Sequence, residues 1–169
     1  MLDRVLHTKR LKLRPVRAAD AKEIAEGIGE WEVIRWLTSP PWPYSLADAE
    51  WFLGQDTRNT DYGIELDGAL RGVVSISSDF DLGYWLAIPC HGHGYMTEAA
   101  SAVVAKHFEH SNAALTSGYL LENAASANVL GKIGFRNTFL RTDYSTPMKA
   151  DVQVQRVELT AQKYRTDHA

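Results

Sequence analysis

The sequence predicts a mixed α/β fold in which a central, mostly antiparallel sheet carries helices on both faces. From residue 61 the apolar residues alternate as they do in strands, and the Asp67-Gly68 pair marks a two-residue hairpin turn. A glycine loop and a long helical pattern, which ends near His110, follow the third of these strands. One more strand, a helix and two final strands complete the pattern, so strands and helices share one layered core.

The composition is that of a soluble globular protein. With 45% hydrophobic and 23% charged residues, the 169 residues are enough for one domain, 1–169, whose core needs neither disulfides nor metals. The net charge is −3 and like charges do not form runs. Neither nucleic acid nor an anionic membrane is therefore an expected partner.

Cys90 is the only cysteine, so the chain cannot form an internal disulfide, which suits a reducing compartment. A lone cysteine without an evident partner is more often a small packing residue than a nucleophile. The first residues mix charged with apolar side chains, and no segment has the length of a signal-peptide core or a membrane span. We therefore expect a cytoplasmic protein.

The N-terminal part predicts one strand and then helices. Residues 10–17 alternate imperfectly and contain Pro15, as in a strand near a sheet edge. Asp20 and Glu23 have the spacing of a capping box that opens a helix over 21–27. A short helix is expected over residues 31–37.

A second capped helix follows the proline-rich loop 38–44. Ser45 and Asp48 predict its N-terminus, and it runs to about Gln55. Its apolar spacing places Trp51 and Phe52 on the inner side of the helix.

Changes in apolar period predict the remaining elements. Tyr62, Ile64 and Leu66 form one face of a strand, and residues 73–77 return as the second strand of the hairpin. The other expected elements are a strand over 82–88, the helix that ends near 110, a strand over 113–121, a helix over 124–133 closed by Gly134, and strands over 136–144 and 152–160.

The stretch from residue 82 into the long helix has the ingredients of an anion site. Gly92 and Gly94 let the backbone approach a ligand. The first-turn amides of a helix have no intrahelical partner, so they and the helix dipole can hold a phosphate. The spacing G-x-G alone fits an ordinary strand-to-helix turn equally well.

Several segments follow one another in the order of a known family. They are RLKLRPVRAAD, PPWPYSLADAEWF, LGYWL with GHGYMTEA, and NAASANVLGKIGF. Together they resemble the GNAT family of N-acetyltransferases, most closely its branch of bacterial ribosomal-protein alanine acetyltransferases. The resemblance covers nearly the whole chain. It implies a sheet that is splayed in the middle, with acetyl-CoA bound between the strands over 82–88 and 113–121.

The resemblance also implies a set of coenzyme contacts, in which the first of these strands serves the pantetheine arm and the glycine loop holds the pyrophosphate. The implied positions are Leu86, Ala87, Ile88, His91, Gly92, His93, Gly94, Tyr95, Met96 and Thr97. Three residues before the first loop glycine the family usually has Gln or Arg, but this chain has Pro89, which offers neither a backbone N–H nor a cation. His91 and His93 are candidates to replace that contact. No third ligand accompanies them, so no metal site is expected.

A second cluster opens the helix over 124–133. Asn and Ser at a helix N-terminus commonly cap it. The resemblance implies that Asn123 and Lys132 contact the coenzyme. It also implies that Ser126 lies near the coenzyme sulfur as the proton donor to the leaving thiolate. For Ser126 both the capping and the catalytic interpretation stay open.

The implied chemistry is direct attack of an amine on a thioester, so a base must take the amine proton. Asp81, just before the coenzyme strand, is the first candidate, and a solvated residue in a strand connection is the alternative. Asp79 and Glu65 are further candidates. Glu65 lies on the strand face opposite Ile64, which places it either in the acceptor cleft or in solvent.

Aromatic residues are the candidates for the acceptor site, because aromatic walls hold peptide N-termini or cationic amines by apolar and cation–π contacts. A protein core would use most of them equally well. With Glu65, the candidates are Trp31, Trp36, Trp42, Tyr44, Trp85 and Tyr144.

We therefore expect an acetyl-CoA-dependent N-acetyltransferase that works through a ternary complex on a protein N-terminus or a small-molecule amine. The alternative is a non-catalytic sensor or scaffold that keeps the acetyl-CoA pocket, and Pro89 motivates it. A nucleotide phosphotransferase is disfavoured because the chain has no G-x-x-x-x-G-K-[ST] loop. The aromatic residues and the late hairpin favour a homodimer.

Overall fold

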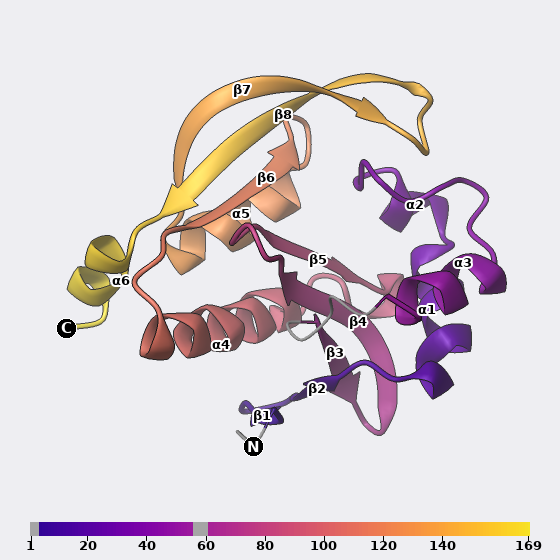
Figure 1. Ribbon diagram of the computed structural model, residues 1–169, viewed down its shortest axis with the longest axis horizontal. Helices are drawn as coiled ribbons and strands as arrows, with labels where there is room; N and C mark the ends of the chain where they lie inside the picture. The colour runs from indigo at the N-terminus through magenta and orange to yellow at the C-terminus, as the bar shows by residue number, and fades with distance from the viewer. Residues whose placement is uncertain (1–3, 56–60) are drawn as a thin grey trace.

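The computed structural model describes residues 4–55 and 61–169 and arranges their strands in two antiparallel sheets (Figure 1). The first sheet has the order β1-β2-β3-β4-β5, and the second has the order β6-β8-β7. The strands are β1 (Leu6–His7), β2 (Lys12–Pro15), β3 (Asp61–Leu66), β4 (Ala69–Ile76), β5 (Leu82–Leu86), β6 (Leu115–Leu120), β7 (Arg136–Ser145) and β8 (Ala150–Leu159).

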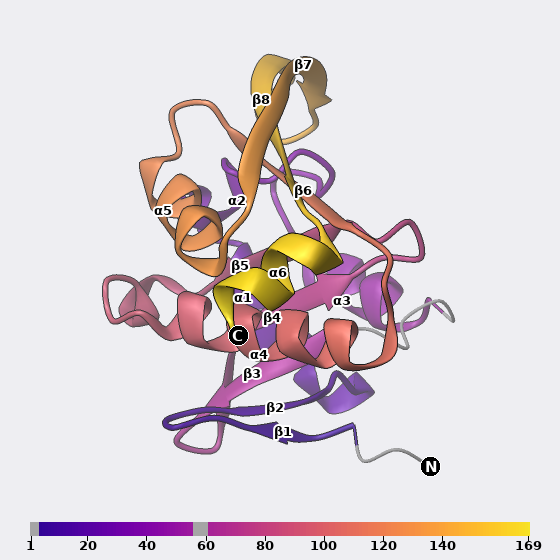
Figure 2. The ribbon, with the colours of Figure 1, turned by 90° about the vertical axis from the view of Figure 1, so that its left-hand side faces the viewer.

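Helices cover both faces of the first sheet, and α5 and α6 flank the second (Figures 1 and 2). The helical elements are η1 (Ala18–Asp20), α1 (Ala21–Ile28), α2 (Trp31–Ile34), α3 (Leu46–Leu53), η2 (Ile88–Cys90), α4 (Tyr95–His110), α5 (Ala124–Ile133) and α6 (Ala161–Asp167). The predicted fold class is confirmed. Among the helices that the structure describes, none is both long enough and apolar enough to cross a bilayer.

The two sheets join where β5 and β6 begin. Asp81 and Thr116 form an isolated parallel bridge, and the Thr116 N–H donates to the Phe80 carbonyl at 2.9 Å. The Ser117 hydroxyl donates to the Leu82 carbonyl at 2.7 Å. Further along, β5 pairs with β4 and β6 pairs with β8, and no ladder joins β5 to β6 in the described part of the chain. The two strands therefore diverge, as expected for a sheet that is splayed in the middle.

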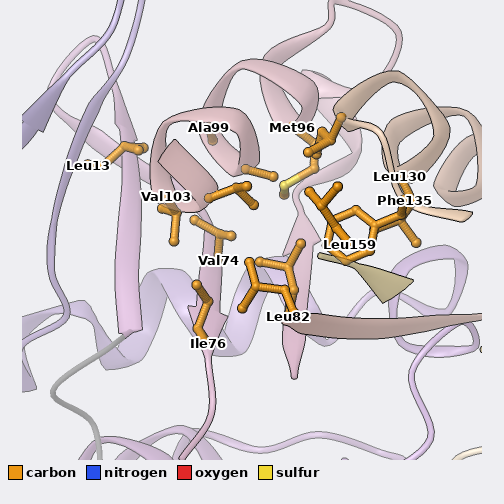
Figure 3. Close-up of a cluster of buried hydrophobic side chains, with 14 of the residues drawn as sticks. Leu13, Val74, Ile76, Leu82, Met96, Ala99, Val103, Leu130, Phe135 and Leu159 are labelled. Atoms are coloured by element: carbon orange, nitrogen blue, oxygen red, sulfur yellow. The ribbon is translucent and has the colours of Figure 1, made fainter. Parts of the chain in front are cut away.

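The main hydrophobic core lies between the first sheet and α4 and extends to α5 and the second sheet, which contribute Leu130 and Leu159 (Figure 3). Val74 from β4 and Leu82 from β5 are fully or almost fully buried against the inner face of α4, which presents Ala99 and Val103. Small residues at these helix positions let the helix lie close to the sheet. Val73, the neighbour of Val74, belongs to a second core with α1 and α3, because successive strand residues point to opposite faces.

Asp20 does not form the predicted capping box with Glu23. It precedes α1 but makes no side-chain cap hydrogen bond. Its carboxylate accepts two hydrogen bonds of 2.9 Å from the Arg14 guanidinium and one of 2.8 Å from the Arg17 N–H. Glu23 instead accepts from the Leu70 N–H at 3.2 Å. A buried carboxylate gains more from a guanidinium fork than from a single cap amide, so the ion pair wins.

The predicted cap of α3 is confirmed, but the orientation predicted for Trp51 is wrong. Ser45 accepts from the Asp48 N–H at 3.2 Å while Asp48 accepts from the Ser45 N–H at 2.7 Å. Trp51 is 69% exposed, whereas Phe52 packs against the second core. A helix of two turns buries only a narrow stripe, and here Ala49 and Phe52 fill it.

Candidate active site

A cleft of about 1170 Å³ opens where β5 and β6 diverge. Its walls come from both sheets, from residues 91–97, from the start of α5 and from the α1–α3 region. Of the residues predicted from the sequence, the cleft lining includes Trp36, Tyr44, Asp81, Trp85, Leu86, Ile88, His91, Gly92, Gly94, Tyr95, Met96, Thr97, Asn123, Ser126 and Lys132. Residues far apart in the chain therefore meet around one space.

The glycine loop forms one end of the cleft. Gly92 and Gly94 have φ of 78° and 77°, a left-handed conformation that glycine adopts without a Cβ clash. Gly94 is the N-cap of α4, and the Glu98 N–H makes a 3.1 Å hydrogen bond to its carbonyl. Because that bond is the first of the helix, the N–H groups of Tyr95, Met96 and Thr97 have no intrahelical acceptor. The positive end of the helix dipole adds to them, so this end of the cleft favours an anion.

Arg10 holds the loop from outside. Its guanidinium donates to the His93 carbonyl at 2.8 Å and to the Glu98 carboxylate at 2.7 Å, and it lies 4.5 Å from the centre of the Tyr95 ring. Glu98 also accepts from the Thr8 hydroxyl at 2.5 Å. Burial raises the pKa of Glu98, but the hydrogen bonds from Thr8 and Arg10 outweigh it and lower the pKa overall. The turn before β2 is thus fastened to the first turn of α4, a contact that the sequence patterns did not indicate.

Two main-chain groups predicted to serve a ligand already have partners. The Leu86 carbonyl accepts from His91 Nε2 at 2.6 Å, and the Ala87 N–H donates to the Arg71 carbonyl at 2.7 Å. Ala87 does not line the cleft, and the same is true of His93, whose ring lies beside Tyr95. Ile88 lies in the η2 turn and not in the strand, because Pro89 cannot continue a β-ladder.

Asn123 and Ser126 make different contacts at the start of α5. Asn123 Oδ1 accepts from the Ser126 N–H at 3.2 Å, so Asn123 is the cap of α5. The Ser126 hydroxyl faces Tyr84, and the two side-chain oxygens are 2.7 Å apart. Burial raises the pKa of Tyr84 to about 12, an effect that the hydrogen bond with Ser126 partly offsets. Sequence reasoning missed Tyr84, although a tyrosine between Leu82 and Leu86 on a buried strand needs a partner for its hydroxyl.

Asp81 lies at the closed end of the cleft, where the sheets meet. Its Oδ1 accepts from the Thr116 hydroxyl at 2.7 Å and from the Arg156 guanidinium. Arg156 comes from β8 and crosses β6 at Gly118, where an added Cβ would lie 2.7 Å from Arg156 Nη1. The other carboxylate oxygen of Asp81, Oδ2, has no hydrogen bond to the described residues, so it can accept one from a bound ligand. Arg156, which the sequence patterns also missed, is 14% exposed.

The second pair of charges at this end is Arg141 with Asp143, whose Nε and Oδ1 are 2.7 Å apart. Both residues line the cleft. Asp79, the third candidate base, is exposed, and its N–H donates to the Ser77 hydroxyl.

Glu65 occupies neither of the two places expected for it. Its carboxylate accepts from Arg14 Nε at 2.7 Å, and Lys12 lies 3.7 Å away. The hydrogen bond from Arg14 lowers the pKa of Glu65. Glu65 pairs with Lys12 of the neighbouring strand β2 and shares one face of the sheet with Lys12 and Arg14, and it does not line the cleft.

Three of the aromatic candidates for the acceptor wall lie in the cleft and three do not. Trp36, Tyr44 and Trp85 line it. Trp42 lies against Trp31, with ring centroids 5.1 Å apart, and neither lines the cleft. Tyr144 is 58% exposed on β7, outside the cleft.

Cys90 is buried in the main core, and burial raises the pKa of its thiol, as expected for a packing residue. Among residues 4–55 and 61–169, no group of three or more His, Cys, Asp or Glu side chains is arranged to hold a metal ion.

Comparison with known proteins places the chain in a family. Residues 10–136 match the family model described as acetyltransferase (GNAT) domain. No curated protein matches the chain. Solved structures do match. One is an acetyltransferase of the GNAT family from Bacillus anthracis, 16% identical, with a TM-score of 0.82 over 94% of this chain and 99% of that one.

Two further solved structures are similar over most of their length. RimJ from Mycobacterium smegmatis, in complex with CoA-disulfide, is 24% identical, with a TM-score of 0.78 over 94% of this chain and 88% of that one. A ribosomal-protein-S5-alanine acetyltransferase from Vibrio fischeri is 18% identical, with a TM-score of 0.77 over 96% and 99% of the two chains. At these identities the likeness establishes a common fold.

Proposed function

The chain belongs to the GNAT acetyltransferases, and from this premise we propose that it moves an acetyl group from acetyl-CoA to a primary amine by direct attack in a ternary complex. The observation that carries the proposal is the cleft between the diverging strands β5 and β6, with an anion-binding loop at one end and Ser126 in its wall. The coenzyme A in the RimJ structure supports the choice of ligand.

The residues of the cleft fit acetyl-CoA. Gly92 and Gly94 leave room for a pyrophosphate, and the N–H groups of residues 95–97 are available as donors. Lys132 adds a cation in the cleft wall. His91, although it lines the cleft, is held by the Leu86 carbonyl. The main-chain donors of the loop therefore carry the phosphate contact that a side chain at position 89 does not supply.

Acetyl-CoA, when bound, supplies an acetyl thioester that a neutral amine can attack. We assign Asp81 to take the amine proton through its Oδ2, and Ser126 to donate a hydrogen bond to the sulfur as the carbon–sulfur bond breaks. The Arg156 and Thr116 contacts fix the orientation of the Asp81 carboxylate. Trp36, Tyr44 and Trp85 form the apolar wall for the acceptor.

The acceptor is a protein N-terminus or a small-molecule amine. An α-amine, with a pKa of about 8, is neutral far more often at neutral pH than a lysine-type amine of about 10.4, so it needs less help from a base. The likeness to a ribosomal-protein-S5-alanine acetyltransferase makes peptides with N-terminal alanine the first amines to test.

Two measurements test the proposal. Calorimetry with acetyl-CoA measures binding, and thiol release in the presence of alanine-starting peptides and small primary amines measures turnover. We expect binding, and free thiol only when a suitable amine is added. Absence of acetyl-CoA binding would refute the proposal, and binding without turnover of any amine would favour a non-catalytic acetyl-CoA sensor.

Ser126→Ala tests the assigned donor. It should lower turnover about 100-fold or more and leave the affinity for coenzyme A nearly unchanged, because general acids contribute mainly to the chemical step. An unchanged rate would remove this role from Ser126.

We further propose a cytoplasmic homodimer. The single, buried Cys90 suits a reducing compartment. Large apolar side chains are exposed on one strand: Phe139 (57%), Leu140 (54%) and Tyr144 (58%) all lie on β7, the edge of its sheet. Light scattering of the purified chain, with Phe139→Ser as the variant, tests the dimer, and a monomer at all concentrations would refute it.

A further inference from the structure

We propose that Tyr84 is a positioning residue for acetyl transfer: its phenol donates to Ser126 Oγ and so directs the single Ser126 hydroxyl proton toward the coenzyme sulfur. This inference rests on the proposed function, because it presumes that Ser126 acts on the sulfur. It adds a second residue, on the opposite wall of the cleft, to the site.

Tyr84 and Ser126 meet through their hydroxyl groups. Tyr84 belongs to β5 and Ser126 to α5, and both line the cleft where the two halves of the molecule have diverged. Their side-chain oxygens are 2.7 Å apart, the ordinary distance of a hydrogen bond between hydroxyls. The Ser126 carbonyl, the other acceptor near the Tyr84 hydroxyl, is 3.5 Å away and is therefore the weaker partner. The Tyr84 side chain thus reaches from β5 to Ser126 on α5.

A hydroxyl has one proton and two lone pairs, so only one of the two groups donates in their shared hydrogen bond. If Ser126 donated to Tyr84, its only proton would be engaged and could not serve the sulfur. A phenol is a stronger acid than an aliphatic alcohol and is therefore the better donor. The Tyr84 phenol is protonated at neutral pH at its ordinary pKa of about 10 and also at the value of about 12 to which burial raises it.

The main chain and the side chain of Ser126 have separate partners. Its N–H is satisfied by Asn123, so the hydroxyl is not needed as a helix cap. With Tyr84 donating to one lone pair of Oγ, the Ser126 O–H is left to point into the cleft. During transfer a bond forms between the amine nitrogen and the acetyl carbon, and the carbon–sulfur bond breaks. The electron pair of the broken bond stays on sulfur as a thiolate, which the Ser126 hydrogen bond stabilises. The amine proton leaves to Asp81, so protons and charge balance.

Tyr84→Phe tests the inference because it removes the hydroxyl and keeps the ring that packs on the core. The probe is coenzyme A, whose bound thiol can be titrated by the ultraviolet absorbance of the thiolate without any acceptor. We expect Tyr84→Phe to raise the pKa of the bound thiol by about half to one pH unit, the size of one ordinary hydrogen bond. Coenzyme A affinity at neutral pH should change less than threefold or so.

The control is Tyr62→Phe. Tyr62 is a partly buried tyrosine of β3 that packs on the same core and does not line the cleft. Tyr62→Phe removes one hydroxyl from a packed strand and leaves Ser126 and its contacts unchanged. We therefore expect no change in the pKa of the bound coenzyme A thiol.

A double-mutant cycle separates positioning from independent action. In the Ser126→Ala background, Tyr84→Phe should no longer change the thiol pKa. An equal change in both backgrounds would overturn the inference, because Tyr84 would then act without Ser126. If Ser126→Ala changes the thiol pKa and turnover but Tyr84→Phe changes neither, the inference fails and the proposed function stands. If Ser126→Ala changes neither, the proposed role of Ser126 fails, and the inference with it.

A second variant keeps the test valid if Tyr84→Phe does not fold. Replacing Tyr84 by 3-fluorotyrosine keeps the packing and makes the phenol a stronger donor. We expect it to lower the pKa of the bound thiol, and an unchanged value would contradict the inference.

Discussion

Arg156 reaches from β8 across β6 to the carboxylate of Asp81, the residue immediately before β5. The contact ties the second sheet to the first at the closed end of the cleft. It also places a fixed positive charge beside the proposed base.

Asp81→Asn should lower turnover about 100-fold while the affinity for coenzyme A stays the same, because the amide cannot take up the amine proton. The Asn side-chain oxygen still accepts from Thr116 and Arg156, so the fold should persist. Steady-state thiol release and calorimetry measure the two quantities. A turnover within a few-fold of the wild type would show that another group is the base.

Gly118→Ala should displace Arg156, because the new Cβ would lie 2.7 Å from Arg156 Nη1 and 2.9 Å from Val154 Cγ1. We expect a loss of about 1–3 kcal/mol in the free energy of unfolding, typical of overpacking. The matched control is Gly131→Ala on α5, where nothing lies within 4 Å and alanine favours the helix by up to about 1 kcal/mol. Urea denaturation compares them, and equal stabilities would contradict the packing described at Gly118.

Gly92→Ala should weaken coenzyme A binding about tenfold, because a Cβ disfavours the left-handed backbone that shapes the loop. Gly68→Ala is the control. Gly68 has φ of 79°, against 78° for Gly92, and both sites are open, but Gly68 lies in the β3–β4 turn. Both variants should lose about 1 kcal/mol of stability or somewhat more, whereas only Gly92→Ala should bind coenzyme A more weakly in calorimetry. Equal affinities would argue against the loop as the pyrophosphate site.

Arg10→Gln should lower coenzyme A affinity about three- to tenfold by releasing the His93 carbonyl and Glu98. Lys106→Gln, which removes the exposed Lys106–Glu109 pair of α4, is the control and should have no effect. Pantetheine, which has no pyrophosphate, should bind both variants and the wild type alike. A loss of pantetheine affinity in Arg10→Gln would mean that the variant disturbs more than the loop.

Acid should destabilise the protein through Asp20, Glu65 and Glu98. Burial raises the pKa of Asp20, but the hydrogen bonds from Arg14 and Arg17 lower it overall. The pKa of each of these carboxyls is lower in the folded than in the unfolded state. Their stabilisation is therefore present above about pH 4, the unfolded value, and is lost as the pH falls through the folded values. The midpoint of thermal unfolding should fall steeply below pH 4.

Asp20→Asn tests whether protonation of Asp20 contributes to the loss of stability in acid. Because Arg14 would keep its charge in a buried place with Glu65 as its remaining carboxylate partner, the variant should be less stable at pH 7 by about 1–3 kcal/mol. It should also lose stability less steeply in acid than the wild type, and an unchanged acid profile would exclude Asp20 as a contributor.

Periodicity and capping patterns predicted most elements because these signals are local. The bounds of α5 agree with the structure, since Asn123 caps the helix and Gly134 ends it with φ of 116°. The strand β1 and the helix α6 were not predicted, because two residues and seven residues carry too little apolar pattern. The start of β5 at Leu82 agrees with the prediction, but the strand ends two residues earlier than the apolar run suggests because Pro89 imposes a turn.

The site was less predictable, because its polar contacts join residues distant in sequence. The residues of a glycine loop or of a helix cap are close together in the sequence. Spacing patterns could therefore indicate the proposed coenzyme-binding part of the site. The partners of Asp81, Ser126 and Glu65 lie on other elements: Arg156, Tyr84 and Arg14. The strand pairing and the crossing at Gly118 decide these contacts, and no spacing rule within one segment encodes them.

The junction at Asp81–Leu82 and Thr116–Ser117 also has a mechanical consequence. Hydrogen bonds between the two sheets gather at that end, whereas β5 and β6 diverge beyond it, with Tyr84 and Ser126 joined across the cleft. The junction is therefore the natural hinge of the molecule. Amides beside it should exchange with deuterium slowly whether or not coenzyme A is present, and those of the diverging ends should become protected only when the ligand bridges them.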